Sequence, residues 1–75
     1  MEDQSGLIQR ALEEGPFSIR DLAVDAGISY DSLYSWARGR RTAKPENLCQ
    51  VADAFERRAE RLRELATAMR NAAHQ

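Results

Sequence analysis

Apolar residues recur three and four positions apart along most of this chain, a spacing that places them on one face of an α-helix. Four of them share a face near the N-terminus: Leu7, Ile8, Ala11 and Leu12. They predict a first helix over residues 7–14, with Asp3 or Ser5 as its cap. Gly15 and Pro16 end it, because glycine readily closes a helix in the left-handed conformation and proline cannot continue one.

A second predicted helix begins after Ser18, whose hydroxyl can accept a hydrogen bond from a backbone N–H of the first turn. Phe17 and Leu22 hold the two positions of a hydrophobic staple, which fixes how the chain enters the helix. The helix covers about residues 19–26 and ends at Gly27, since a residue with a Cβ adopts the left-handed conformation reluctantly.

The same signals repeat in the next segment. Ser29 is the cap and Leu33 the staple residue of a third helix, predicted over residues 30–38 and ended by Gly39. Six apolar residues of the two helices and their turn are placed inward: Leu22, Ala23, Ala26, Ile28, Leu33 and Trp36. Ala23 is small where the two helices approach most closely. The pattern therefore predicts two short helices set at an angle around a tight turn.

From Pro45 to Ala73 the chain contains no further glycine or proline, which predicts one long helix. Proline is tolerated in the first turn of a helix, and Thr42 or Lys44 is the boundary residue before it. At about 1.5 Å per residue this helix is roughly 40 Å long, longer than the small core that it leaves. The alternative is a break near residues 57–61 with the last part folded back, although no helix-stopping residue marks one.

The long helix carries a seven-residue repeat in which large apolar residues alternate with alanines. The repeat consists of Leu48, Phe55, Leu62 and Met69, and of Ala52, Ala59, Ala66 and Ala73. Its first half is placed to cover the core, whereas its second half has no partner within the chain. We expect that half to form a homodimer interface. The interface residues are Leu62, Leu65, Ala66, Met69 and Ala73. An exposed amphipathic tail is the alternative, and the pattern leaves parallel and antiparallel pairing open.

These elements predict an all-α protein of about four helices. Residues 1–56 form the helical bundle and residues 57–75 the oligomerisation segment. A chain of 75 residues buries only about 60–65% of its unfolded surface, so help from a partner chain is expected. No apolar run approaches the roughly 20 residues of a membrane span, and the acidic N-terminus is unlike a secretory signal. We expect a soluble cytoplasmic protein.

Charge is distributed unevenly, although the net charge is only −1. Residues 1–37 contain seven acidic residues and two arginines, whereas residues 38–45 contain three arginines, one lysine and no acidic residue. The remaining residues balance five acidic residues with five arginines. A positive patch directly after the third helix is where a nucleic-acid backbone would pass. A solvated surface loop is the alternative interpretation of this patch.

The residues suited to catalysis or metal binding are isolated. The single histidine, His74, lies in the tail, and the single cysteine, Cys49, has no histidine near it in sequence. We therefore expect no enzymatic activity, metal, cofactor or small-molecule ligand. Cys49 also excludes an intramolecular disulfide, and we expect it in or near the core.

Steps of 100° per residue around the third helix separate an inward from an outward arc. The inward arc holds Leu33, Trp36 and Ala37, and we assign Trp36 to the core. The outward arc holds Asp31, Tyr34, Ser35 and Arg38, with Tyr30 at its flank.

The caps, the glycine turn and the inward residues between Ser18 and Arg41 resemble the helix-turn-helix of the phage lambda repressor-like (Cro/Xre) DNA-binding family. The resemblance covers roughly residues 7–55, although a helical corner without DNA function has similar geometry. It implies that the helix over residues 30–38 enters the major groove of double-stranded DNA. It also implies base contacts by Tyr30, Asp31 and Ser35, and phosphate contacts by Arg20 and Arg38.

Further contacts follow from the chemistry of single residues. Tyr30 and Tyr34 can each pack against a thymine methyl or donate a hydroxyl to a phosphate, and the alternative is that they shield the edge of the core. The cations Arg40, Arg41 and Lys44 are assigned to phosphates. Ser18 joins them because a helix N-terminus favours an anion. Asp31 is unusual, since phosphates repel a carboxylate unless it accepts from cytosine N4 or pairs with Arg20 or Arg38.

These features together predict a sequence-specific, homodimeric transcriptional regulator of bacterial or phage type, a repressor, that binds nucleoid DNA with one recognition helix per half-site. The alternative is a protein-interaction module that works through its long helix, such as an antitoxin or a phage assembly or DNA-packaging adaptor that forms a ring.

Overall fold

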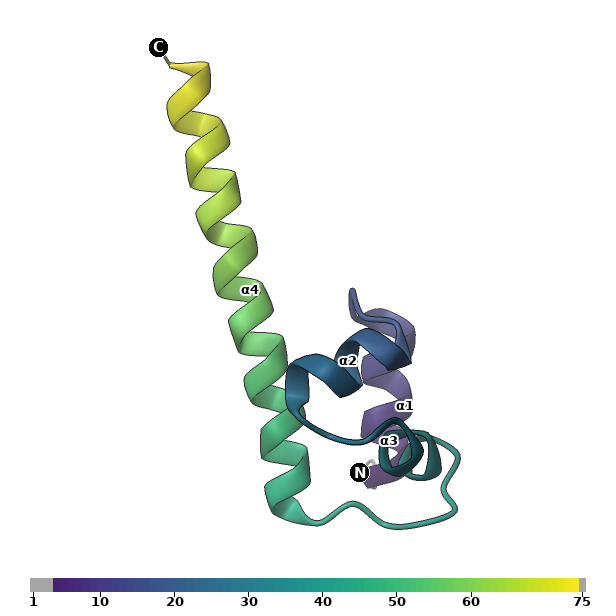
Figure 1. Ribbon diagram of the computed structural model, residues 1–75. Coiled ribbons are helices and arrows are strands. Elements are labelled where there is room, and N and C mark those ends of the chain that lie inside the picture. The colour runs from purple at the N-terminus through teal and green to yellow at the C-terminus, as the bar shows by residue number, and fades with distance from the viewer. Residues whose placement is uncertain (1–3, 75) are drawn as a thin grey trace.

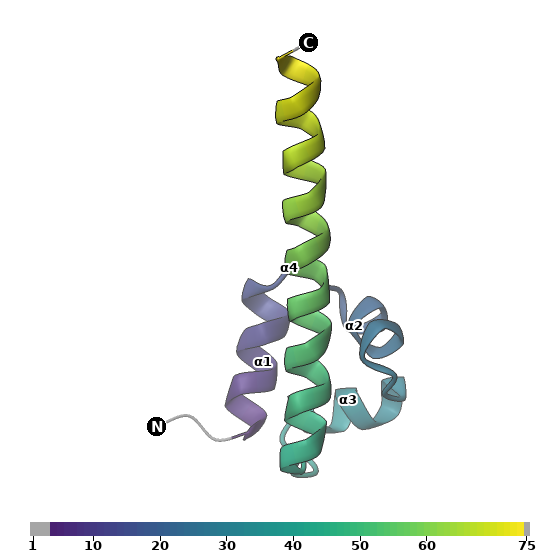
Figure 2. The ribbon, with the colours of Figure 1, turned by 90° about the vertical axis from the view of Figure 1, so that its left-hand side faces the viewer.

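The computed structural model describes residues 4–74, and this part of the chain forms four α-helices and no strand (Figure 1). The helices are α1 (Gln4–Glu14), α2 (Ile19–Ala26), α3 (Tyr30–Ala37) and α4 (Pro45–Ala73). α2 packs against the first half of α4, α1 lies beside that half, and α3 packs against α1 and α2. The second half of α4 projects beyond the other helices (Figures 1 and 2). The predicted all-α fold with a long C-terminal helix is confirmed.

α1 begins earlier than the apolar pattern indicates. It starts at Gln4, so Ser5 lies inside the helix and the prediction that it is the cap is wrong; the other candidate, Asp3, lies outside the described residues. At its C-terminal end the Gly15 N–H donates to the Ala11 carbonyl oxygen at 2.8 Å. A Cβ at Gly15 would lie 2.6 Å from Cε2 of Phe55, so the missing side chain allows α4 to approach this turn.

The caps of α2 and α3 form as predicted. The Ser18 hydroxyl accepts from the Asp21 N–H, and the Ser29 hydroxyl accepts from the Ser32 N–H, both at 3.1 Å. Gly27 closes α2 with φ of 70°, and the following N–H, of Ile28, donates back to the Ala23 carbonyl oxygen at 3.0 Å. Glycine in this left-handed conformation commonly ends a helix in this way, because the N–H groups that follow can then bond to the last carbonyl groups of the helix.

α3 ends at Ala37, one residue before the predicted end, because Arg38 is its C-terminal cap and Gly39 takes φ of 73°. Five of the six residues predicted to point inward are buried, with Leu33 fully enclosed and Trp36 in the core. The sixth, Ile28, is half-buried and packs against the same cluster. The angle between the two short helices is therefore set by an apolar core and the Gly27 turn.

α4 contributes to that core only through its first half. Val51 and Ala54 are buried, and Leu48 and Phe55 pack against the cluster. Lys44 is the boundary residue, and its N–H donates to Oδ1 of Asn47 at 3.1 Å. Cys49 is exposed, so its predicted place in or near the core is wrong. It follows Leu48 by one position, and 100° of rotation turns it away from α1 and α2.

The second half of α4 continues without a break to Ala73, which rules out the folded-back alternative. The exposed fractions of Leu62 and Met69 are 49% and 69%. Leu65 is exposed and Ala66 half-buried. As predicted, no part of the described chain covers this apolar face.

Candidate nucleic-acid interface

α3 presents a polar face on the side opposite to its core contacts. Leu33 and Trp36 anchor the helix, which leaves the predicted base-contact residues at the surface. Tyr30 and Asp31 are exposed, and Tyr34 and Ser35 are half-buried. None of them is enclosed by another helix, so this face is accessible to a partner.

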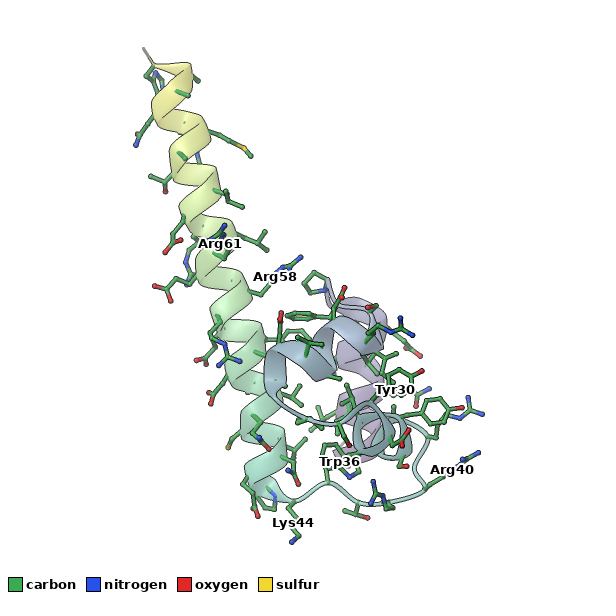
Figure 3. The ribbon with its side chains drawn as sticks, viewed as in Figure 1. Tyr30, Trp36, Arg40, Lys44, Arg58 and Arg61 are labelled. Atoms are coloured by element: carbon green, nitrogen blue, oxygen red, sulfur yellow. The ribbon has the colours of Figure 1, made fainter. Side chains whose placement is uncertain are left out.

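Two tyrosines and two arginines form one continuous stack along this face. The rings of Tyr30 and Tyr34 are 6.0 Å apart at an interplanar angle of 14°. The guanidinium Cζ atoms of Arg38 and Arg40 lie 5.5 Å and 5.8 Å from the centroid of the Tyr34 ring. Figure 3 shows Tyr30 and Arg40 on the side of the molecule away from α4. Cation–π attraction thus holds two positive charges beside the outward face of α3.

The turn at Gly39 brings Arg40 into this stack. The Gly39 N–H donates to the Trp36 carbonyl oxygen at 3.1 Å, and the Arg40 N–H donates to the Ser35 carbonyl oxygen at 2.9 Å. The chain therefore reverses over the end of α3, and the side chain after the glycine returns to the helix surface. The repeat of tyrosine and arginine at positions 30, 34 and 38 is the sequence signal for part of this stack.

Arg41 lies against a different flank of α3. Its Nη2 donates to Oγ of Ser32 at 3.2 Å, and the Ser29 hydroxyl donates to the same oxygen at 2.9 Å. Sequence reasoning did not single out Ser32 for this role. Its position three residues after the cap Ser29 is the only signal. Lys44 lies further along the loop, exposed, at the start of α4 (Figure 3).

The other two predicted phosphate contacts come from the start of α2. Ser18 and Arg20 are exposed there, and the Ser18 hydroxyl caps the helix. Figure 1 shows α2 on one side of α3 and the loop over residues 38–44 on the other. The predicted cations therefore flank α3 from two directions instead of forming one cluster.

Asp31 keeps its carboxylate at the surface in the first turn of α3, where the helix dipole favours a negative charge. Among the residues that the structure describes, neither Arg20 nor Arg38 lies within ion-pair distance of it. The pairing considered for Asp31 is therefore not formed, and Arg38 contacts Tyr34 instead.

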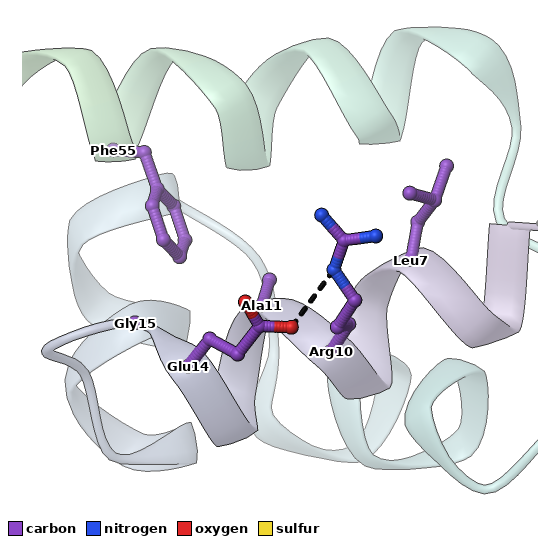
Figure 4. A pocket seen from close by; sticks show the side chains of 6 residues that line it. All are labelled: Leu7, Arg10, Ala11, Glu14, Gly15 and Phe55. Atoms are coloured by element: carbon purple, nitrogen blue, oxygen red, sulfur yellow. Dashed lines mark ion pairs between the residues drawn. The ribbon is translucent and has the colours of Figure 1, made fainter.

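The hollows of the molecule lie away from this face. One lies between α2 and α4, at Asp25, Ala54 and Arg57. Two others lie between α1 and α4. One is lined by Leu7, Ala11, Gly15 and Phe55 beneath the Arg10–Glu14 ion pair, whose Nε and Oε2 atoms are 2.9 Å apart (Figure 4). The adjoining one, of about 320 Å³, is apolar. We call it the α1–α4 groove; its lining residues are Leu7, Ile8, Ala11, Leu48, Val51, Ala52 and Phe55.

Residues 4–74 contain neither a cluster of histidine, cysteine and acidic side chains that could hold a metal ion nor a helix long and apolar enough to cross a bilayer.

Comparison with protein families gives a match of residues 8–62 to a family described as helix-turn-helix. Comparison with curated proteins and with solved structures gives no significant match.

Proposed function

The chain belongs to the Cro/C1-type, lambda repressor-like helix-turn-helix family, and we propose that it acts as a homodimeric, sequence-specific regulator of transcription. The matched residues include all of α2 and α3 and the loop after them. Membership of this family supports DNA binding of the transcription-regulator type. The site of action in this proposal is nucleoid DNA in the cytoplasm.

The observation that carries the proposal is the accessible face of α3 with arginines on its flank. In a helix-turn-helix the second helix enters the major groove, where each base pair presents a distinct pattern of donors and acceptors. The proposed base contacts are made by Tyr30, Asp31, Tyr34 and Ser35. Asp31 has no arginine partner in the described chain, which favours a donor such as cytosine N4 opposite its carboxylate.

The cations on either side of α3 serve the phosphate backbone in this proposal. Phosphate contacts fix register and orientation without reading sequence. On the loop side they come from Arg38, Arg40, Arg41 and Lys44, and on the α2 side from Ser18 and Arg20. Such contacts release counterions, so binding weakens as the salt concentration rises.

The homodimer is supported by the exposed apolar face of the second half of α4. Large apolar side chains stand out of this helix at three positions: Leu62, Leu65 and Met69. Together with Ala66 and Ala73 they form the proposed interface in the segment over residues 57–75. Two copies would bind two half-sites of a pseudo-palindrome, and repression follows if that operator overlaps a promoter.

Selection of bound sequences from random duplex DNA, followed by gel shift on the selected site, tests the proposal. We expect a conserved pseudo-palindrome that is bound at about 100 mM salt at least 100-fold more tightly than scrambled DNA of the same length. Equal affinity for both duplexes would contradict sequence-specific binding. Ultracentrifugation of the free protein tests the dimer independently of DNA.

A second candidate function, a protein-interaction module, is favoured by the same exposed face of α4. In that case Leu62→Asp abolishes partner binding while Arg40→Ala with Arg41→Ala leaves it intact. The regulator predicts instead that the double arginine change weakens binding to every DNA sequence. The double arginine variant therefore separates the two functions.

A further inference from the structure

The apolar stripe of α4 runs from the α1–α4 groove into the uncovered second half without interruption. Leu48, Ala52 and Phe55 line the groove. Leu62 and Met69 continue the same face at seven-residue intervals from Phe55, and both are exposed. The groove and the tail are thus two ends of one apolar surface, and the structure leaves both of them open.

We propose that these two ends cover each other in an antiparallel dimer, with residues 57–73 of each copy lying in the α1–α4 groove of the other. This inference rests on the homodimer of the proposed function and adds its orientation and the occupant of the groove. The occupant is a second copy of this chain.

The order of residues along α4 fits such a pairing about Ala59. When Ala59 faces the same residue of the second copy, Ala52 lies level with residue 66, and Phe55 lies near Leu62. Leu48 lies near Met69 in the same register. Large side chains thus meet large ones, alanines meet alanines, and the small residue at the two-fold axis lets the helices approach closely.

Charge along α4 selects the antiparallel orientation. Residues 45–56 contain three acidic residues and no basic one, whereas residues 57–73 contain five arginines and two glutamates. Antiparallel helices place the acidic half of each against the basic half of the other. A parallel pair would place the two acidic halves side by side and the two arginine-rich halves side by side, which is destabilising. The helix dipoles also oppose each other favourably in the antiparallel pair.

The surroundings of α4 favour the same orientation. Its first half is flanked by α1 and α2, whereas no helix of the described chain packs against its second half (Figure 2). A bare helix can enter the groove, but the first half of another α4 would bring its own α1 and α2 with it. In the register about Ala59, the two Leu48 residues are 22 positions apart along the helix axis. This corresponds to about 33 Å along the axis of α4.

Disulfide cross-linking of single-cysteine variants tests the orientation. The native Cys49 is first replaced by serine, and Ala52→Cys and Ala66→Cys are prepared separately. We expect covalent dimers only when the two variants are mixed and oxidised, because residues 52 and 66 of one copy are each far from their own counterparts in the other. A matched mixture of Gln50→Cys and Ala68→Cys has the same register on the opposite face and should remain monomeric on a denaturing gel.

Self-linking of either interface variant would overturn the antiparallel arrangement, as would the absence of any link in the mixture. DNA binding is measured separately, by gel shift of the wild-type protein without cross-links. A result against the antiparallel orientation therefore does not contradict the proposed function.

The groove itself is tested by Leu7→Asp, at a residue of α1 whose exposed fraction is 42%. We expect the dimer to dissociate at least tenfold more readily in ultracentrifugation, with an unchanged helical circular dichroism spectrum. Val24→Asp, at a residue of α2 whose exposed fraction is 76%, is the control and should leave the dimer intact. An equally stable dimer in both variants would show that the tail does not occupy the groove.

Discussion

Nη2 of Arg57 donates a hydrogen bond to the backbone carbonyl oxygen of Asp25 at 2.6 Å, across thirty-two residues of the chain. The carbonyl groups at the C-terminal end of a helix have no partner within the helix, and a cation there also interacts favourably with its dipole. Arg57 thus ties α4 to the last turn of α2, immediately before the Gly27 turn that orients α3. A contact that holds α2 and α3 in place is therefore made by a residue of α4.

Arg57→Ala should therefore lower the free energy of unfolding by about 1 kcal/mol, since a charge-assisted hydrogen bond is lost at a solvent-exposed site. Urea unfolding at a fixed protein concentration measures the change. Arg63→Ala removes the same charge from the uncovered half of α4 and should change stability by no more than a few tenths of a kcal/mol. Equal losses in both variants would show that charge, and not the Asp25 contact, is responsible.

Arg40→Ala combined with Arg41→Ala should weaken binding to every DNA sequence and reduce the slope of log affinity against log salt by about 2, because two phosphate contacts are lost. Arg61→Ala is the charge control, since Figure 3 shows Arg61 on α4, far from Arg40 and Lys44. Gel shifts at several salt concentrations give the slope. An unchanged slope in the double variant would place these arginines away from the phosphates.

Tyr34→Ala should weaken DNA binding about 5- to 30-fold, because Arg38 and Arg40 both lose the ring that positions them. Tyr34→Phe keeps the ring, and we expect it to bind within about threefold of the wild-type protein, on the energy scale of exposed cation–π contacts. Titrations of the selected site with the three proteins measure the difference. A large loss in Tyr34→Phe would assign the contribution to the hydroxyl instead.

Gly15→Ala should destabilise the fold by about 1–3 kcal/mol, because its Cβ would lie 2.5 Å from the Ala11 carbonyl oxygen and would press on the Phe55 ring. Gly27→Ala meets no atom within 4 Å and should cost only the backbone strain of a positive φ, about 1 kcal/mol. Thermal or urea unfolding ranks the two variants. A larger loss of stability in Gly27→Ala than in Gly15→Ala would show that the turn after α1 can move to make room for the added Cβ.

Local signals were sufficient to predict the helix pair. Ser18, Ser29 and Gly27 each act through the backbone of their own turn, so their effect is readable without knowledge of the fold. Pro45 marks the start of α4 for the same reason. Where a helix begins or ends depends on such neighbours, and these four boundaries agree with the structure to within a residue.

Features that depend on contacts between distant segments were not predictable in the same way. The direction from which α2 packs on α4 decides that Ala54 is buried and Cys49 exposed, and no periodicity specifies that direction. The stack of Tyr34 with Arg40 depends on a chain reversal at Gly39, and the Arg57 contact depends on the docking of two helices. The cations therefore appeared in the sequence as one patch, whereas their side chains follow separate flanks of α3.

The continuity of α4 has a mechanical consequence. The first half of this helix packs into the core against α2, and the second half lies outside the core. After Pro45 the helix contains no glycine or proline at which it could bend. A change in the tilt of its second half therefore rotates the whole helical bundle. Substitutions near Met69, remote from the surface of α3, would thereby change the distance and angle between the bundles of two copies.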